Sequence, residues 1–152
     1  MSLLFGSALV ERAREIAYRV HAGHFRRDGV TPYVEHLQDV VARLEQMGLD
    51  DPEYLAAAWL HDSIEDGRLS SDELLSHKEF PFSVPITVHA LTKRPGERYA
   101  DYIARVKVVV IARHVKIADI ISNLADDPTP RQLKRYSWAL NYLFTDSVYL
   151  GK

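Results

Sequence analysis

Six consecutive apolar residues, 55–60, lead directly into His61 and Asp62, and Glu65 and Asp66 follow within one turn. A helix that is apolar all round is usually buried, so this stretch predicts a central helix with polar groups at its end. Three carboxylates at that end are unfavourable, because the helix dipole places partial negative charge there. A bound divalent metal ion would offset the charge, whereas the alternative is a solvated acidic helix end. The preceding apolar stretch favours a buried site.

The helix that carries these residues is expected to begin at Asp51-Pro52 and to end at Gly67. An aspartate before a proline at the first helical position is a frequent helix start, and glycine is a frequent helix end. Continued to Gly67, the helix would stack His61 over Glu65 on one face.

Helical spacing of apolar residues dominates the rest of the chain. Residues 106–111 are rich in β-branched side chains and could form a strand, but the apolar pattern continues at helical spacing to Leu124, which favours a helix. Ser7 and Thr31 are the expected N-caps of the first two helices. We therefore expect an all-α fold, a single bundle of about seven to eight helices. The expected helices cover residues 7–24, 31–47, 51–67, a short segment from 70 or 71, 85–91, 99–124, and 130 into the 140s.

The composition is that of an ordinary globular domain. The 152 residues suffice for one domain with a substantial core, so we expect residues 1–152 to form a single domain without a second one. A net charge of −2 gives no reason to expect nucleic-acid or membrane partners. The absence of cysteine excludes disulfides and thiolate zinc sites and fits a cytoplasmic protein. We expect no secretory signal and no membrane span, and the oligomeric state stays open.

Two further candidate residues are ambiguous from their local sequence. His36 lies at the edge of an apolar stripe, where a histidine is more often a core or rim residue than a metal ligand. Asp119 shares a helix face with Lys116 and Asn123, and taken alone this is the polar face of an amphipathic helix. The remaining histidines are expected to be structural or on the surface: His21, His24, His77, His89 and His114.

Three segments, taken together and in this order, resemble the HD-domain metal-dependent phosphohydrolases. More narrowly, they are similar to the hydrolase domain of RelA/SpoT-type alarmone enzymes and of their small stand-alone relatives. The resemblance covers roughly residues 8–143, and its order and spacing are specific for the superfamily but less so for the substrate. The segments are Arg-Arg-Asp-Gly-Val-Thr-Pro-Tyr-Val-Glu-His at 26–36, Ala-Ala-Trp-Leu-His-Asp-Ser-Ile-Glu-Asp at 57–66, and Val-Lys-Ile-Ala-Asp at 115–119 with Asn123-Leu124.

The resemblance implies a metal centre and a pair of acidic residues beside it. Two imidazoles and two carboxylates suit a divalent ion, and Mn²⁺ is the ion known for this branch. Glu65 and Asp66 match the acidic pair that orients or deprotonates the attacking water. The implied metal ligands are His36, His61, Asp62 and Asp119.

The resemblance also implies substrate contacts. Arg26 matches a loop position that packs against a guanine base, and Lys116 and Asn123 match positions that line the nucleotide pocket. The chain departs from the family at Leu37, where a proline often follows the first ligand histidine. It departs more seriously at 91–99, whose basic residues could hold phosphates or form a plain solvated loop.

Three functions follow from these patterns. The first is metal-dependent hydrolysis of a nucleotide phosphoester, specifically removal of the 3′-pyrophosphate from (p)ppGpp. The second keeps the metal site but changes the substrate, as in a 5′-nucleotidase-like enzyme, and the departing loop motivates it. The third is a nucleotide-binding HD protein without turnover. A small-molecule nucleotide is the expected partner in all three.

Overall fold

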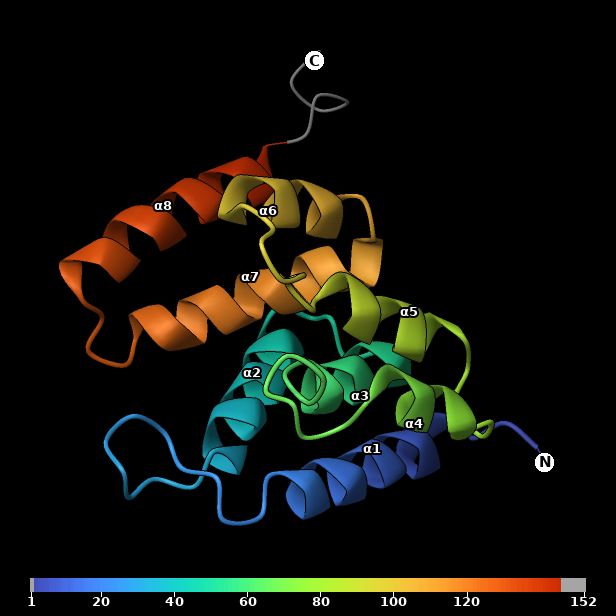
Figure 1. Ribbon diagram of the computed structural model, residues 1–152. Coiled ribbons are helices and arrows are strands. Elements are labelled where there is room, and N and C mark those ends of the chain that lie inside the picture. Colours follow the sequence, from blue (N-terminus) through green and yellow to red (C-terminus); the bar gives the residue numbers. More distant parts are fainter. Residues whose placement is uncertain (1, 146–152) are drawn as a thin grey trace.

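The computed structural model describes residues 2–145, and this part of the chain contains eight α-helices. The all-α fold expected from the sequence is confirmed (Figure 1). No helix among the described residues is long and apolar enough to cross a membrane. The helices are α1 (Gly6–Val20), α2 (Val34–Gln46), α3 (Pro52–Leu60), α4 (Ser71–Ser76), α5 (Ser83–Ala90), α6 (Tyr99–Lys107), α7 (Val110–Leu124) and α8 (Pro130–Phe144).

Helix α3 lies at the centre of the fold, as its unbroken apolar run predicts (Figure 1). It packs against α1, α2, α5 and α7, so every side of the helix meets another helix. All of residues 55–60 are buried. A helix surrounded in this way needs apolar side chains all round, which explains why its sequence shows no polar face. The C-terminal end of α3 therefore lies inside the protein, so His61, which follows it, is buried.

Helix α3 ends at Leu60, and its expected continuation to Gly67 is wrong. The cause is the His61 side chain, whose Nδ1 lies 2.7 Å from the carbonyl oxygen of Ala58. In a continuing helix, that oxygen would accept the N–H of Asp62. Residues 61–67 instead form consecutive turns, so His61 and Glu65 do not share a helix face.

The start of α2 also differs from the expectation. Helix α2 begins at Val34, and Thr31 is not its N-cap. Thr31 belongs to a loop in which the Asp28 carboxylate accepts the backbone N–H groups of Val30 and Thr31 and the Thr31 hydroxyl. Gly29 closes this loop with a positive φ of 78°, a conformation that glycine adopts without strain. The loop places Arg26 beside the site described below.

Smaller differences concern three other segments. Helix α1 starts after Phe5, so Ser7 is not its N-cap, and it ends at Val20 instead of residue 24. The predicted helix over 99–124 is interrupted at Val108 and Val109, and no described residue of 106–111 forms a strand. Helix α4 starts as expected, with a capping box between Ser70 and Glu73.

The packing of α2 into the core yields a stability prediction. Leu37 is fully buried, so Leu37→Ala should lower the free energy of unfolding by about 2–5 kcal/mol. Leu133 on α8 is 46% exposed, and Leu133→Ala makes the same chemical change with an expected cost below about 1 kcal/mol. Urea unfolding followed by circular dichroism measures both values. Equal losses for the two variants would contradict this assignment of the core.

Candidate metal centre

The structure brings His36, His61, Asp62 and Asp119 together in one cluster. His36 projects from α2, His61 and Asp62 from the turns after α3, and Asp119 from α7. One nitrogen or oxygen atom of each side chain lies within 4.8 Å of those of the other three. Both histidines and Asp119 are buried. Residues 83 positions apart in the sequence, such as His36 and Asp119, thus meet inside the helical core.

The two imidazole rings point the same nitrogen into the cluster. Nε2 of His36 is 2.9 Å from Asp119 Oδ1, and Nε2 of His61 is 3.3 Å from the same oxygen. Nδ1 of His61 donates to the carbonyl oxygen of Ala58, and Nδ1 of His36 lies 3.2 Å from the Ser122 hydroxyl. Contacts of this kind on the outer nitrogen are what fix the ring orientation of metal-binding histidines.

The donor set fits a divalent metal ion. The Nε2 and carboxylate atoms are separated by 2.9 to 3.8 Å across the cluster. Ligand atoms that bind one ion at about 2.0–2.2 Å lie roughly 3 Å apart, so small movements would place an ion between them. Two neutral imidazoles and two carboxylates also match the preference of borderline and hard divalent ions. The four residues could therefore hold such an ion.

Asp119 is the most tightly held carboxylate of the cluster, and the amphipathic-face interpretation of its helix is wrong. Only 3% of Asp119 is exposed, and Lys116 and Asn123 are turned toward it, not toward solvent. Lys116 Nζ donates to Oδ2 at 2.8 Å, and Asn123 donates to Oδ1 at 3.2 Å. Burial alone would raise the pKa of Asp119, but Lys116 and the two histidines outweigh it and hold that pKa well below its usual value.

The carboxylates in turn act on His61. Burial disfavours the charged imidazolium, yet Asp62 and Asp119 outweigh this effect and hold the pKa of His61 well above its usual value. The pKa of Asp62 is lowered correspondingly, because His61 overcomes the cost of burial. Tyr33 donates its hydroxyl to Asp62 Oδ2 at 2.5 Å. A proton and an incoming metal ion therefore compete for the same nitrogen of His61.

Glu65 and Asp66, the expected acidic pair, are exposed residues of the turns that follow Asp62. Glu65 Oε1 accepts the backbone N–H of Lys93 at 2.7 Å, so this carboxylate is tied to the loop after α5. The Asp66 carboxylate forms no hydrogen bond or ion pair with any described residue. Although the residue is exposed, partial burial of its carboxyl group, followed by the charges of Asp62 and Glu65, raises the pKa of Asp66 to about 7.

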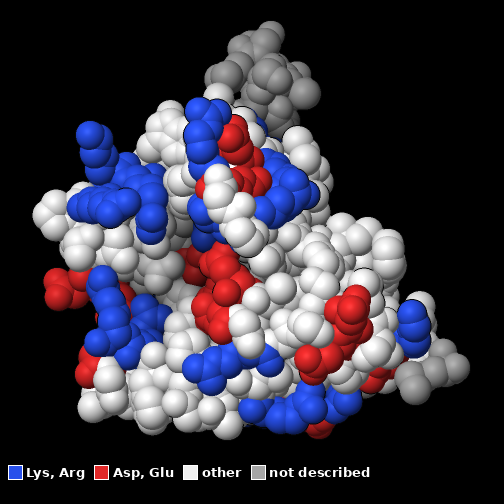
Figure 2. Space-filling view, in the orientation of Figure 1, with Lys and Arg blue, Asp and Glu red and all other residues white. Residues whose placement is uncertain are grey.

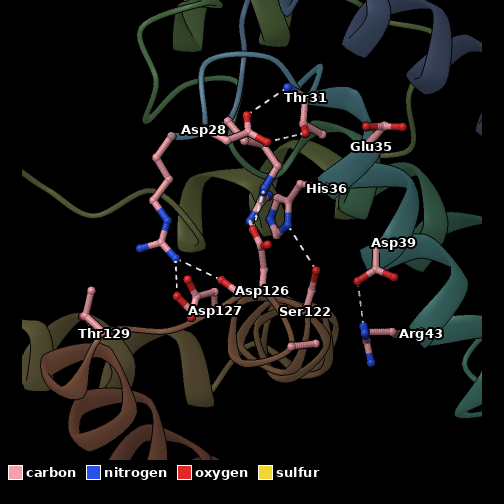
Figure 3. A pocket seen from close by; sticks show the side chains of 13 residues that line it. Asp28, Thr31, Glu35, His36, Asp39, Arg43, Ser122, Asp126, Asp127 and Thr129 are labelled. Atoms are coloured by element: carbon pink, nitrogen blue, oxygen red, sulfur yellow. Dashed lines mark hydrogen bonds and ion pairs between the residues drawn. The ribbon is translucent and has the colours of Figure 1, made fainter.

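Arg26 lines a pocket of about 600 Å³ that reaches inward to His36 (Figure 3). Its guanidinium is bound to the Asp126 carboxylate by two hydrogen bonds, of 2.6 and 3.0 Å, from Nη2 and Nε. Arg27 donates to the backbone carbonyls of Asp126 and Asp127. Figure 3 shows Asp126 and Asp127 facing the 26–31 loop across the pocket. The loop that carries Arg26 is thus fastened to the segment between α7 and α8.

Of the basic side chains of 92–98, only that of Arg98 is paired with an acidic residue in the described part of the chain. Arg98 pairs with Asp101 at 2.8 Å, and the Glu97 carboxylate accepts from the backbone N–H of Arg94 and from Arg105. The Lys93 side chain has no ion pair in the described part of the chain. These contacts shape a self-contained loop, and only its Lys93 backbone N–H reaches the candidate site.

Acidic and basic groups are segregated around the site. Figure 2 shows acidic side chains in a hollow near the centre of this face, with lysine and arginine groups on the surrounding surface. The lysine and arginine groups around the hollow would attract an anionic ligand, and the acidic side chains inside the hollow would attract a cation. The face is therefore suited to bind a metal ion and a phosphate-bearing molecule together.

Sequence reasoning did not identify Tyr33, Ser122, His21 or His24 near the site. Tyr33 precedes His36 by one helical turn, a spacing that could have suggested contact. Ser122 follows Asp119 by three residues, and this spacing also places two side chains side by side on a helix. His21 is buried and His24 is half-buried, and their rings stack on one another and on Tyr33. His21 and His24 form a group with Asp66 that the sequence separates by more than forty residues.

An all-helical domain with a buried cluster of two histidines and two aspartates is the arrangement that the HD-domain resemblance implies. The chain is 33% identical over 135 residues to a GTP pyrophosphokinase of Streptomyces coelicolor. It is 34% identical over 135 residues to that of Streptomyces antibioticus. Each alignment covers 83% of this chain but only 15% of the relative, so the chain spans a small part of these proteins. A probable GTP pyrophosphokinase of Mycobacterium leprae is 33% identical over 126 residues, covering 77% of this chain and 16% of that protein.

A solved structure supports the same relationship at the level of the fold. It is described as a metazoan ortholog of SpoT that hydrolyzes ppGpp and plays a role in starvation responses. Its TM-score is 0.76 at 24% identity, and the match covers 93% of this chain and 88% of that one. No family model matches the chain. The expected likeness to RelA/SpoT-type enzymes is therefore confirmed, in sequence by the GTP pyrophosphokinases and in fold by the SpoT ortholog.

The raised pKa of His61 leads to a prediction about metal binding. Because a proton competes with an incoming ion for His61, the apparent affinity for Mn²⁺ should weaken as the pH falls from about 8 to 6. Calorimetric titration at several pH values measures this trend. Repeating the titration in buffers with different ionisation enthalpies should reveal proton release. An affinity that does not vary over this range would contradict the prediction.

Proposed function

We propose that the chain is a metal-dependent phosphohydrolase that removes the 3′-pyrophosphate from (p)ppGpp. The observation that carries this proposal is the buried cluster of His36, His61, Asp62 and Asp119 beside a polar pocket. Its fold resembles that of a protein described as hydrolysing ppGpp, which supports the choice of substrate. Water would attack the phosphorus bonded to the 3′-oxygen, the bond from that phosphorus to the 3′-oxygen would break, and the products would be pyrophosphate and guanosine 5′-diphosphate or 5′-triphosphate with a free 3′-hydroxyl.

In this proposal the two acids at the exposed edge handle the attacking water. When bound, a divalent ion supplies positive charge that makes a water easier to deprotonate and offsets the charge of phosphate. With a pKa of about 7, the Asp66 carboxylate suits proton transfer near neutral pH. Glu65 is held by the Lys93 backbone N–H and would orient the water. Lys116 would hold Asp119 in place, because its ammonium group already neutralises that carboxylate.

The pocket beside His36 is the proposed nucleotide site. Its volume of about 600 Å³ lies within the usual range for small-ligand pockets of about 300–1,000 Å³. Arg26 would stack on the purine ring, since a guanidinium is planar and polarisable. Asn123, the other expected nucleotide contact, does not line this pocket, and its amide donates to Asp119. It would contact only a part of the nucleotide that extends from the pocket toward Asp119. Asp126 competes with the nucleotide for Arg26 in the structure as it stands.

Three finer points belong to the same proposal. Mn²⁺ is the proposed ion, because imidazole and carboxylate ligands together suit it. Residues 1–152 are proposed to act as one HD domain. A cytoplasmic location is proposed because the substrate is an intracellular signalling nucleotide and the chain has no cysteine.

A 5′-nucleotidase-like activity is the second candidate, and the 92–98 loop favours it. Arg98 is paired with Asp101, so the side chains of Lys93 and Arg94 are the basic groups that this loop would offer to a second phosphate chain. A mononucleotide would need fewer such contacts. The third candidate, nucleotide binding without turnover, is less well supported, because both acids and all four ligands are present.

A substrate panel separates the candidates. With added Mn²⁺, the protein should release pyrophosphate from ppGpp and leave nucleoside monophosphates intact. Chromatography of the nucleotides together with a pyrophosphate assay measures both outcomes. Release of orthophosphate from monophosphates alone would replace the first proposal by the second. Binding of ppGpp without any product would establish the third.

The metal cluster yields a catalytic prediction. Loss of a residue that only hydrogen-bonds a metal ligand typically costs roughly 10–100-fold in activity. Asp62→Asn removes a charged ligand itself, so it should reduce kcat/KM by more than that. Asp50→Asn is the matched control, since Asp50 is exposed and outside the cluster, and it should retain full activity. Metal content of both proteins is measured alongside. Equal activity in the two variants would exclude the cluster from catalysis.

The ion pair between Arg26 and Asp126 yields a prediction about substrate affinity. Asp126→Asn frees Arg26 from a competing carboxylate, so KM for ppGpp should fall by about 1.4–5-fold, the equivalent of an exposed ion pair worth 0.2–1 kcal/mol. Asp127→Asn is the control, because this neighbour carries the same charge in the same pocket but its carboxylate does not bind Arg26. A fall in KM for Asp127→Asn of the same size would assign the effect to general charge.

A further inference from the structure

A second group of potential ligands lies beside the first cluster. His21 and His24 come from the turn after α1, and Asp66 comes from the turns after α3. One ligand atom of each lies within 4.8 Å of the other two. The Nδ1 atoms of the two histidines are 2.9 Å apart. This is close to the roughly 3 Å that separates two nitrogens bound to one ion at about 2.0–2.1 Å.

Contacts within the protein do not satisfy these three side chains. A hydrogen bond between two neutral imidazoles uses one nitrogen of each ring, and Nε2 of His21 is buried without a partner. His21 itself is only 2% exposed. Asp66 makes no hydrogen bond or ion pair through its carboxylate among the described residues. Unpaired buried groups are rare in proteins, so the buried Nε2 of His21 is an exception among the described residues. Asp66 is exposed, so its carboxylate is open to solvent and available as a ligand.

The described surroundings of the group do not supply Asp66 with a cationic partner. Arg68 is near enough to influence the pKa values of all three side chains, but it forms no ion pair with Asp66 in the described part of the chain. Burial, followed by the charge of His24, lowers the pKa of His21 to about 4, so its ring is neutral near pH 7. A neutral imidazole has a lone pair available for a metal ion. Asp66 is exposed, which leaves a path from solvent.

We propose that His21, His24 and Asp66 bind a second divalent transition-metal ion, next to the centre formed by His36, His61, Asp62 and Asp119. Two imidazoles and one carboxylate form the ligand set of catalytic zinc sites, which leaves a position open for water or a phosphate oxygen. Zn²⁺ and Co²⁺ are the ions that such a set favours.

Tyr33 forms the wall between the two sites. Its ring stacks on that of His24, with centroids 4.2 Å apart, and its hydroxyl donates to Asp62 in the first cluster. Asp66 would then be a ligand of the second ion, and the proton-transfer role proposed for it above would apply to the protein without that ion. Binding of the second ion does not depend on hydrolysis, because a protein without phosphohydrolase activity would bind it equally.

The test counts bound ions. Metal-free protein is loaded with Co²⁺, and the ions per chain are measured by mass spectrometry after gel filtration, together with the visible absorption of the bound ion. The wild type should bind two ions. His24→Gln and Asp66→Asn should each bind one, and Asp62→Asn should retain the second-site ion and its absorption bands. His89→Gln, an exposed histidine on α5, is the control and should bind two.

The variants distinguish failure of this inference from failure of the proposed function. A single ion that is lost in Asp62→Asn but retained in both His24→Gln and Asp66→Asn would overturn the second site. A single ion that is lost in His24→Gln and in Asp66→Asn but retained in Asp62→Asn would support the second site. The same result would remove the basis of the proposed catalytic centre. Circular dichroism verifies that each variant is folded, and Asp66→Asn, on an exposed turn, tests the site without altering the core.

Discussion

The buried carboxylate of Asp119 is the interaction on which the site depends. It accepts from Lys116 and Asn123 on its own helix, and it meets His36 from α2 and His61 from the end of α3. A charge in the interior is costly unless it is paired and hydrogen-bonded, so these partners are needed for the carboxylate to be there at all. Because they come from three different parts of the chain, they also fix how α2, α3 and α7 meet.

The end of α3 shows how the core positions the chemistry. The apolar run of α3 is long enough to cross the centre of the fold. The helix ends where the Nδ1 of His61 donates a hydrogen bond to the carbonyl oxygen of Ala58. That one contact ends the helix and sets the imidazole so that Nε2 faces Asp119. The same bond thus serves the fold and the site.

Much of this could be predicted from the sequence, and the failures have physical causes. The apolar run fixed the central helix, because no other arrangement hides all six side chains. The first cluster was predicted only through a family resemblance, since His36 and Asp119 look locally like ordinary rim and surface residues. Periodicity cannot reveal that the polar face of α7 is turned inward, because burial there depends on partners far along the chain. Nor can it show that Thr31 serves a loop instead of a helix, since the competing Asp28 contacts are equally local.

The group of His21, His24 and Asp66 was missed for a related reason. Its two histidines end one helix and its carboxylate follows another, so only the packing of α1 against α3 brings them together. Tyr33 then joins this group to the first cluster, because one side chain contacts both His24 and Asp62. A shift of Tyr33 that accompanies an event at one group must disturb a contact at the other. The two groups are therefore linked through one side chain, which contacts His24 on one side and Asp62 on the other.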